Sequence, residues 1–386
     1  MTRSDPSVIP SDPAVINATL PPPVIALIEA GRNTLGTGAT APTACHNVAL
    51  DDLTNYTLRH GMLAWAPVPL ADGVRRRHMT HALDGVRLLQ VAAAALADAS
   101  VEAVALKGPA FSQWLYGDPC ARRFSDLDLL VAQSQRDAAV GVLEQLGFAP
   151  RLPRGARDVV YAGIGAWPME RPGSHTVDLH WQLAGSRYPQ VVSTRDVLEH
   201  ASEISLAACS IRVPCADHTA ALTLAHAAKH LWYALELPFA IATMARRPDI
   251  DWVAVRRLTV DAGSLPCAAA GLLLASTLFH VDVPAPFRAD TELPVVAELC
   301  RCARLTLALP PGTFPDRRLE RRMHRLAFDR LADRVRYDAR RLFEPTPAEV
   351  AWVPLPPSLS VLYWPLRVVR LGVLLVQGAF TPSPPG

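Results

Sequence analysis

Residues 122–131 read RRFSDLDLLV, and this stretch predicts a strand that carries two carboxylates on one face. Side chains alternate between the faces of a strand, so Asp126 and Asp128 point the same way, about 7 Å apart along the backbone. Leu127 and Leu129 point the opposite way, into a core. Two carboxylates beside a buried face are unfavourable unless a positive charge lies between them. Carboxylate oxygens suit Mg²⁺ or Mn²⁺, so the stretch predicts a divalent metal site.

A residue that is rare in this chain lies shortly upstream. Of the 38 Lys and Arg residues, only Lys107 and Lys229 are lysines. Lys107 and Gly108 stand between a predicted strand, 102–106, and a predicted helix, 109–116. A lysine ammonium is a compact charge that can reach phosphate oxygens. The residues alone leave two interpretations open: a phosphate-binding lysine, or a lysine whose position has no such meaning.

A third acidic position follows in residues 175–181, HTVDLHW. Polar and apolar residues alternate here as in a half-buried strand, with Asp178 and His180 on the polar face. If this strand lies next to the first, Asp178 joins Asp126 and Asp128 in a cluster of three carboxylates. Such a cluster is typical of a two-metal site for phosphoryl transfer. The alternative is a strand face that simply contacts solvent.

The order of these features resembles the nucleotidyltransferase superfamily, whose small core is shared with polymerase beta. More narrowly, the pattern LKG…LYGDP…R…DLDLLV…VDLHW, with the ending LFEPTPAEVAWVPLPPSLSVLYWPLRVVRL, resembles the uncharacterised bacterial nucleotidyltransferase family. Members of that family occur in natural-product gene neighbourhoods, including those for lasso peptides. The resemblance covers most of the chain. It implies an α+β fold, with a small mixed nucleotidyltransferase sheet, flanking helices and a mainly helical C-terminal lobe.

The resemblance also implies roles for the three acids. Asp126 and Asp128 would hold the Mg²⁺ (or Mn²⁺) that bridges the nucleotide phosphates. Asp178 would complete the second metal site and help to deprotonate the attacking hydroxyl. From its place on the strand, His180 is expected to orient Asp178 through a hydrogen bond, and metal ligation by His180 is the alternative.

Three further residues would bind the nucleotide phosphates. Gly108 would let the backbone approach the triphosphate, and Lys107 and Arg123 would neutralise its charge. Backbone amides where a strand enters a helix form an anion site. One departure from the superfamily pattern is Pro109, which follows Gly108 where a Ser or Gly is common. Proline suits a first helical turn but offers neither a hydroxyl nor an amide hydrogen to a phosphate.

A later helix, predicted over 217–235, carries a second candidate group. His226 and His230 are four residues apart and therefore share a face. A zinc protease motif would need Glu at position 227, where the chain has Ala227. Lys229 lies between the histidines and, if it faces the cleft together with His226, could contact the nucleotide or the acceptor. A helix face that only packs against neighbours is the alternative.

The organisation of the whole chain divides into five expected segments. They are a disordered arm (1–23), N-terminal helices (24–100), the nucleotidyltransferase core (101–190), a helical C-terminal lobe (191–345) and a Pro-rich C-terminal strap (346–386). Finer predictions include a helix at 78–98 that buries Leu83, a strand at 159–164 and one long helix at 316–342.

Composition narrows the choice of partners. The net charge is +2, which gives no global polyanion signal. The arginine-rich segment 316–341 could guide a nucleic acid, but a solvated face of paired charges is favoured. The seven cysteines contain no Cys-x-x-Cys pair, and the N-terminus lacks the apolar run of a signal peptide. No apolar stretch is long enough to span a membrane. A reducing, cytoplasmic location is expected, and the oligomeric state is left open.

The leading hypothesis is a metal-dependent nucleotidyltransferase that moves a nucleoside monophosphate from an NTP, such as ATP, to an unidentified acceptor. A small molecule or a peptide in natural-product tailoring would fit the resemblance. One alternative is a catalytically degenerate relative that binds a nucleotide or a partner, favoured by Pro109 and disfavoured by the three retained acids. Another is a nucleotidyltransferase toxin. An aminoglycoside-kinase-type enzyme is disfavoured, because no catalytic-loop Asp with a downstream metal-binding Asn is found.

Overall fold

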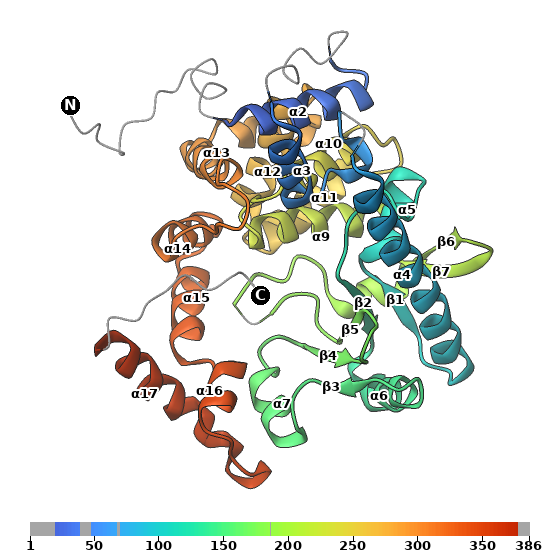
Figure 1. Ribbon diagram of the computed structural model, residues 1–386. Coiled ribbons are helices and arrows are strands. Elements are labelled where there is room, and N and C mark those ends of the chain that lie inside the picture. The colour runs from blue at the N-terminus through green and yellow to red at the C-terminus, as the bar shows by residue number, and fades with distance from the viewer. Residues whose placement is uncertain (1–19, 39–47, 68–69, 186, 377–386) are drawn as a thin grey trace.

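The computed structural model describes residues 20–38, 48–67, 70–185 and 187–376 (Figure 1). A five-stranded sheet and a two-stranded hairpin are accompanied by helices along the rest of the described chain. The expected α+β class, with a small mixed sheet and a helical C-terminal part, is therefore confirmed. Among the described residues, no helix is long and apolar enough to cross a membrane.

The five-stranded sheet has the order β1-β2-β5-β4-β3. β2 and β5 are parallel, and the other three pairings are antiparallel. The strands are β1 (Ala103–Ala105), β2 (Asp126–Val131), β3 (Ala149–Pro150), β4 (Ala166–Glu170) and β5 (Thr176–His180). The hairpin consists of β6 (Ser202–Leu206) and β7 (Cys209–Val213).

Helices precede, interrupt and follow the sheet. Those up to the hairpin are α2 (Pro22–Thr34), α3 (Leu50–His60), α4 (Asp72–Asp98), α5 (Gly108–Tyr116), α6 (Arg136–Gln145), α7 (Arg154–Val160) and α8 (Thr194–Glu199). Those after it are α9 (Ala216–Lys229), α10 (Glu236–Ala245), α11 (Trp252–Asp261), α12 (Leu265–Phe279), α13 (Pro294–Leu307), α14 (Arg317–Leu326), α15 (Leu331–Phe343), α16 (Pro347–Trp352) and α17 (Tyr363–Val376). The short 3-10 helix η6 (Pro357–Leu362) joins α16 to α17.

The two faces of β2 belong to different cores. Leu127 and Leu129 are buried with α4 and α6 in the core of the sheet lobe. Leu130, on the other face with Asp126 and Asp128, is buried in the larger core formed by α2, α9, α10, α12 and α13. Full burial of a leucine contributes about 1.5–3 kcal/mol, so hydrophobic packing on both sides fixes which way the strand faces. The acidic face of the sheet is thereby directed toward the helical body.

The C-terminal helices return from the helical body to the sheet lobe. In Figure 1 they run down one side of the molecule, in orange and red, until η6 contacts α7. The buried carboxylate of Glu349 accepts hydrogen bonds from Arg367 and Arg370 and so ties α16 to α17. On α14 and α15, Arg321 and Arg325 both pair with Asp338, which agrees with the favoured interpretation of paired charges.

Several local predictions are wrong. The expected strand at 159–164 falls on the end of α7 and a turn, and the strand begins instead at Ala166. Short apolar runs suit a buried helix end as well as a strand, which explains the error. Leu83 is 53% exposed, because α4 turns Ala82 and Val86 toward the core. Of the expected arm 1–23, residues 1–19 lie outside the described residues, whereas α2 already begins at Pro22.

Two predicted helices are shorter in the structure than expected. The single helix expected at 316–342 is interrupted between α14 and α15, where the chain bends to bury Phe328. The helix expected at 217–235 ends at Lys229, and Leu231 and Trp232 take left-handed backbone angles before α10 begins. Such angles are unusual for large side chains, so the sequence carries no ordinary stop signal there.

Candidate functional site

The acidic cluster is assembled by the parallel pairing of β2 and β5. Their register places Asp128 directly opposite Asp178, and Asp126 lies two residues before Asp128 on the same strand. Asp128 is 5% exposed, whereas Asp126 and Asp178 are partly exposed. The structure thus brings the three predicted acids to one sheet face. Parallel strands in register, rather than a loop, fix their spacing.

Two positively polarised groups contact the buried acid. The ammonium of Lys107 donates to Asp128 Oδ1 at 3.2 Å, and His180 Nε2 donates to the same oxygen at 2.9 Å. The expected hydrogen bond from His180 to Asp178 is therefore replaced by one to Asp128. The ring is also held through Nδ1, which lies 3.4 Å from the carbonyl oxygen of Gln182.

The electrostatics of the three acids differ. Burial opposes the charged form of Asp128, but Lys107 and His180 together hold its pKa well below the usual range. Burial, followed by the charge of Asp128, raises the pKa of Asp178 to about 6. The same two causes raise the pKa of Asp126. A carboxylate cluster with raised pKa values is one whose charge is incompletely compensated, and a bound cation would compensate it.

The donor set of this cluster fits a divalent cation. One ligand atom each of Asp128, Asp178 and His180 lie within 4.8 Å of one another. If a cation binds His180 Nε2, the neutral ring would carry its proton on Nδ1 and donate it to the Gln182 carbonyl, which is the usual way in which a ligating histidine is oriented. Carboxylates with one imidazole suit Mn²⁺ as well as Mg²⁺. Asp126 is not part of this three-residue group.

The start of α5 brings backbone close to the acids. Gly108 has a φ of +64°, a conformation that L side chains rarely adopt. A Cβ atom on Gly108 would lie 3.3 Å from Leu127 Cδ2, so glycine allows α5 to begin against β2. Lys107 is the N-cap residue of α5, and Pro109 stands in its first turn. The helix N-terminus, the lysine and the acids therefore share one corner of the fold.

The two arginines before β2 have different environments. Arg122, whose side chain is 12% exposed, donates to Glu236 Oε1 of α10 at 2.7 Å and lines the cavity described below. Arg123, the residue expected beside the nucleotide phosphates, donates to the carbonyl oxygen of Leu58 at 3.3 Å and does not line that cavity. Adjacent residues on an extended segment point in opposite directions, and the sequence did not show which one faces inward.

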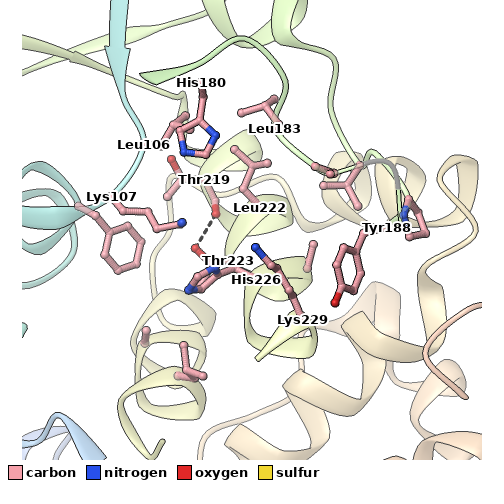
Figure 2. A pocket seen from close by; sticks show the side chains of 18 of the residues that line it. Leu106, Lys107, His180, Leu183, Tyr188, Thr219, Leu222, Thr223, His226 and Lys229 are labelled. Atoms are coloured by element: carbon pink, nitrogen blue, oxygen red, sulfur yellow. Dashed lines mark hydrogen bonds between the residues drawn. The ribbon is translucent and has the colours of Figure 1, made fainter. Parts of the chain in front are cut away.

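A cavity of about 120 Å³ lies between this corner and the helical body (Figure 2). Both lysines of the chain, Lys107 and Lys229, line it, together with His180 and His226. Burial, followed by the charge of Lys107, lowers the pKa of Lys229 and holds the pKa of His226 well below its usual range. His230 contacts the ring of His226, with the ring centres 4.4 Å apart.

Sequence reasoning missed most of the cavity wall. From α9 the wall includes Thr219, Leu222, Thr223, His226 and Lys229. Their spacing of three or four residues marks one helix face. The same periodicity could have indicated the threonines and Leu222, but the sequence prediction considered only the histidines and the lysine. Tyr188 and Glu236 also line the cavity but have no local sequence signal.

One comparison with known proteins, a match to a family model, agrees with the chemistry of this site. The crystal structure of an antigenic nucleotidyltransferase-like protein from Paracoccidioides brasiliensis is similar at 15% identity and a TM-score of 0.29, covering 50% of this chain and 96% of that chain. A likeness this distant carries no argument. No curated protein matches the chain. A family model described as uncharacterised nucleotidyltransferase matches residues 60–280, which include the acidic cluster and α9. Because that match spans more than half of the 386 residues, the chain belongs to this nucleotidyltransferase family.

Proposed function

We propose that the protein is a metal-dependent nucleotidyltransferase that moves a nucleoside monophosphate from an NTP to an acceptor hydroxyl. The observation that carries this proposal is the register of β2 and β5, which sets Asp128 opposite Asp178, with His180 close enough to share a cation. Lys107 and the start of α5 lie beside these groups, where the phosphates of the nucleotide would be.

In the proposed reaction the acceptor oxygen forms a bond to the α-phosphorus, and the bond from that phosphorus to the oxygen bridging to the β-phosphate breaks. Pyrophosphate leaves, and Asp178 accepts the hydroxyl proton. A pair of divalent ions, when bound, stabilises the attacking and leaving oxygens. Asp126 and Asp128 would hold the nucleotide-side ion, while Asp178 and His180 complete the donor set.

The phosphate groups would be held by this chain's cations and backbone. Lys107 would exchange its contact with Asp128 for a phosphate oxygen when a cation joins the acids. Gly108 would allow the close backbone approach. Pro109 removes one amide donor from the first turn of α5, so the lysine carries more of the binding. Arg122 adds positive potential nearby, whereas Arg123 stays a prediction for that role.

The test is the thermal stability of the full chain with each of the four NTPs, with and without Mg²⁺ or Mn²⁺. We expect a metal-dependent rise in melting temperature, absent in Asp128→Asn. The matched control is Asp137→Asn on α6, whose side chain is 80% exposed and lies outside the paired strands. Release of pyrophosphate with candidate acceptors then measures turnover. If no NTP stabilises the wild type with either metal, the degenerate, partner-binding alternative replaces this proposal.

A further inference from the structure

The positive charges around the cavity are not equally compensated. Lys107 pairs with Asp128 and Arg122 pairs with Glu236. The Lys229 side chain, by contrast, makes no hydrogen bond or ion pair within the part of the chain that the structure describes. Its amine lies 6.0 Å from the centre of the Tyr188 ring, and Figure 2 shows it directed into the cavity. A cation with no such partner in the described chain therefore faces this space, where it can pair with an anionic group of an occupant.

Most of the cavity wall is apolar. It includes Leu106, Phe111, Leu183, Val191, Leu222 and Leu237. An aliphatic group placed here would gain about 25 cal/mol for each Å² of apolar surface buried. The lining thus favours an occupant with an apolar body and an anionic group.

The size of the cavity limits the occupant further. Its volume is about 120 Å³. An apolar protein cavity of about 150 Å³ holds benzene. A molecule with a short aliphatic chain is of the right size.

We propose that this cavity is the acceptor site, and that the acceptor is a small hydroxy acid whose carboxylate pairs with Lys229. Its aliphatic body would contact the apolar walls, and its hydroxyl would point toward His180 and the acids on the sheet. This inference rests on the proposed nucleotidyl transfer and adds the class of acceptor.

The presence of only two lysines allows a direct readout. Reductive methylation with ¹³C-formaldehyde labels Lys107, Lys229 and the α-amine, and Lys→Met variants assign the signals. The probes are butyrate and 4-hydroxybutyrate, with butyramide as the uncharged control. We expect both carboxylates to shift the Lys229 signal and the amide to leave it unchanged. Carboxylates that shift no signal more than butyramide does would overturn the proposal.

Binding to the unlabelled variants separates this site from the nucleotide site. Calorimetry should show that Lys229→Met weakens carboxylate binding at least tenfold, while it changes metal–NTP binding less than threefold. Lys107→Met, the matched control, should show the reverse pattern. Lys229→Arg should restore part of the carboxylate affinity, because the charge is kept. Equal loss of NTP binding in Lys229→Met would instead assign Lys229 to the phosphates. A wild type that binds carboxylate but no NTP would refute the nucleotidyl transfer and leave the carboxylate site standing.

Discussion

His180 Nε2 and Asp128 Oδ1 lie 2.9 Å apart on the neighbouring strands β5 and β2. This contact makes His180 a member of the acidic cluster, not a bystander on the strand. Imidazole is a better ligand for Mn²⁺ than for Mg²⁺, which prefers oxygen. His180→Ala should therefore reduce Mn²⁺-supported activity by about 10–100-fold, and Mg²⁺-supported activity by less. The measurement is turnover over a titration of each metal. His200→Ala, at an exposed histidine after α8, is the control, and an equal loss with both metals would argue against ligation by His180.

The buried pair Arg122–Glu236 should be important for stability. It joins the segment before β2 to α10 at 2.7 Å, with both side chains largely buried. Removing one partner of a buried pair leaves an uncompensated charge and costs about 3–5 kcal/mol. We expect that loss of unfolding free energy in Glu236→Gln or Arg122→Met, measured by urea denaturation. Arg122→Met combined with Glu236→Leu should lose much less than the sum, because neither charge remains. Additive losses would show that the pair is not coupled.

Gly108→Ala should lower stability by about 1–2 kcal/mol, because a side chain is strained at a φ of +64°. The same variant should weaken metal–NTP binding, since the added Cβ would displace the start of α5 from β2. Gly141→Ala provides the matched control. Gly141 lies within α6 with a normal φ and open space around its Cβ position, and alanine there should stabilise the helix by up to about 1 kcal/mol. Equal stability of the two variants, measured by urea denaturation, would contradict the strain argument.

Acidification should destabilise the fold through its buried histidines. His60 is 0% exposed, its Nδ1 accepts the N–H of Leu235, and burial lowers its pKa to about 3. The unfolded chain binds a proton at His60 below about pH 6.5, whereas the folded chain stays neutral there down to about pH 3. Stability is therefore lost as the pH falls through this window. His230 and His324, with pKa values lowered to about 3 and about 4, act in the same direction.

The contribution of His60 to this loss of stability can be isolated by comparing His60→Asn with the wild type at pH 7 and pH 5.5. Each such histidine contributes about 1.4 kcal/mol of lost stability at pH 5.5, one unit below its unfolded pKa. The variant is less stable at pH 7 but should lose about that much less on acidification. The raised pKa of Asp178 acts in the opposite direction in both proteins and cancels in the comparison. Parallel pH profiles would show that His60 is protonated in the fold.

The strands of the site could be predicted from the sequence, because their signal is local. Strand β2 was predicted at Asp126–Val131 and β5 within 175–181, and both alternate apolar and polar residues as half-buried strands do. That alternation also placed Asp126, Asp128 and Asp178 on polar faces. The sequence does not predict that β2 pairs with β5, because strand order depends on contacts between residues that are distant in sequence.

The cavity could not be predicted in the same way. Lys229 and His226 were placed on a common helix face, but the side to which α9 turns that face is decided by packing on α10 and α12. The sequence could not decide between Arg122 and Arg123 for the same reason, since a buried partner on α10 holds Arg122 inward. Sequence periodicity indicates which residues lie together on an element, and tertiary packing decides what they meet.

The register of β2 and β5 has a consequence for tolerance to insertions and deletions. Since side chains alternate, adding one residue within β5 would turn Asp178 into the core and bring Val177 or Leu179 to the acidic face. Length changes in the turn at 171–175 leave the register intact, because they lie outside the paired residues. Burial of the apolar side chains of β5 therefore also determines which way its polar side chains point. Changes that keep the apolar side chains of β5 buried keep Asp178 in position. Insertion or deletion of one residue within β5 should lose both the apolar packing and the position of the carboxylate.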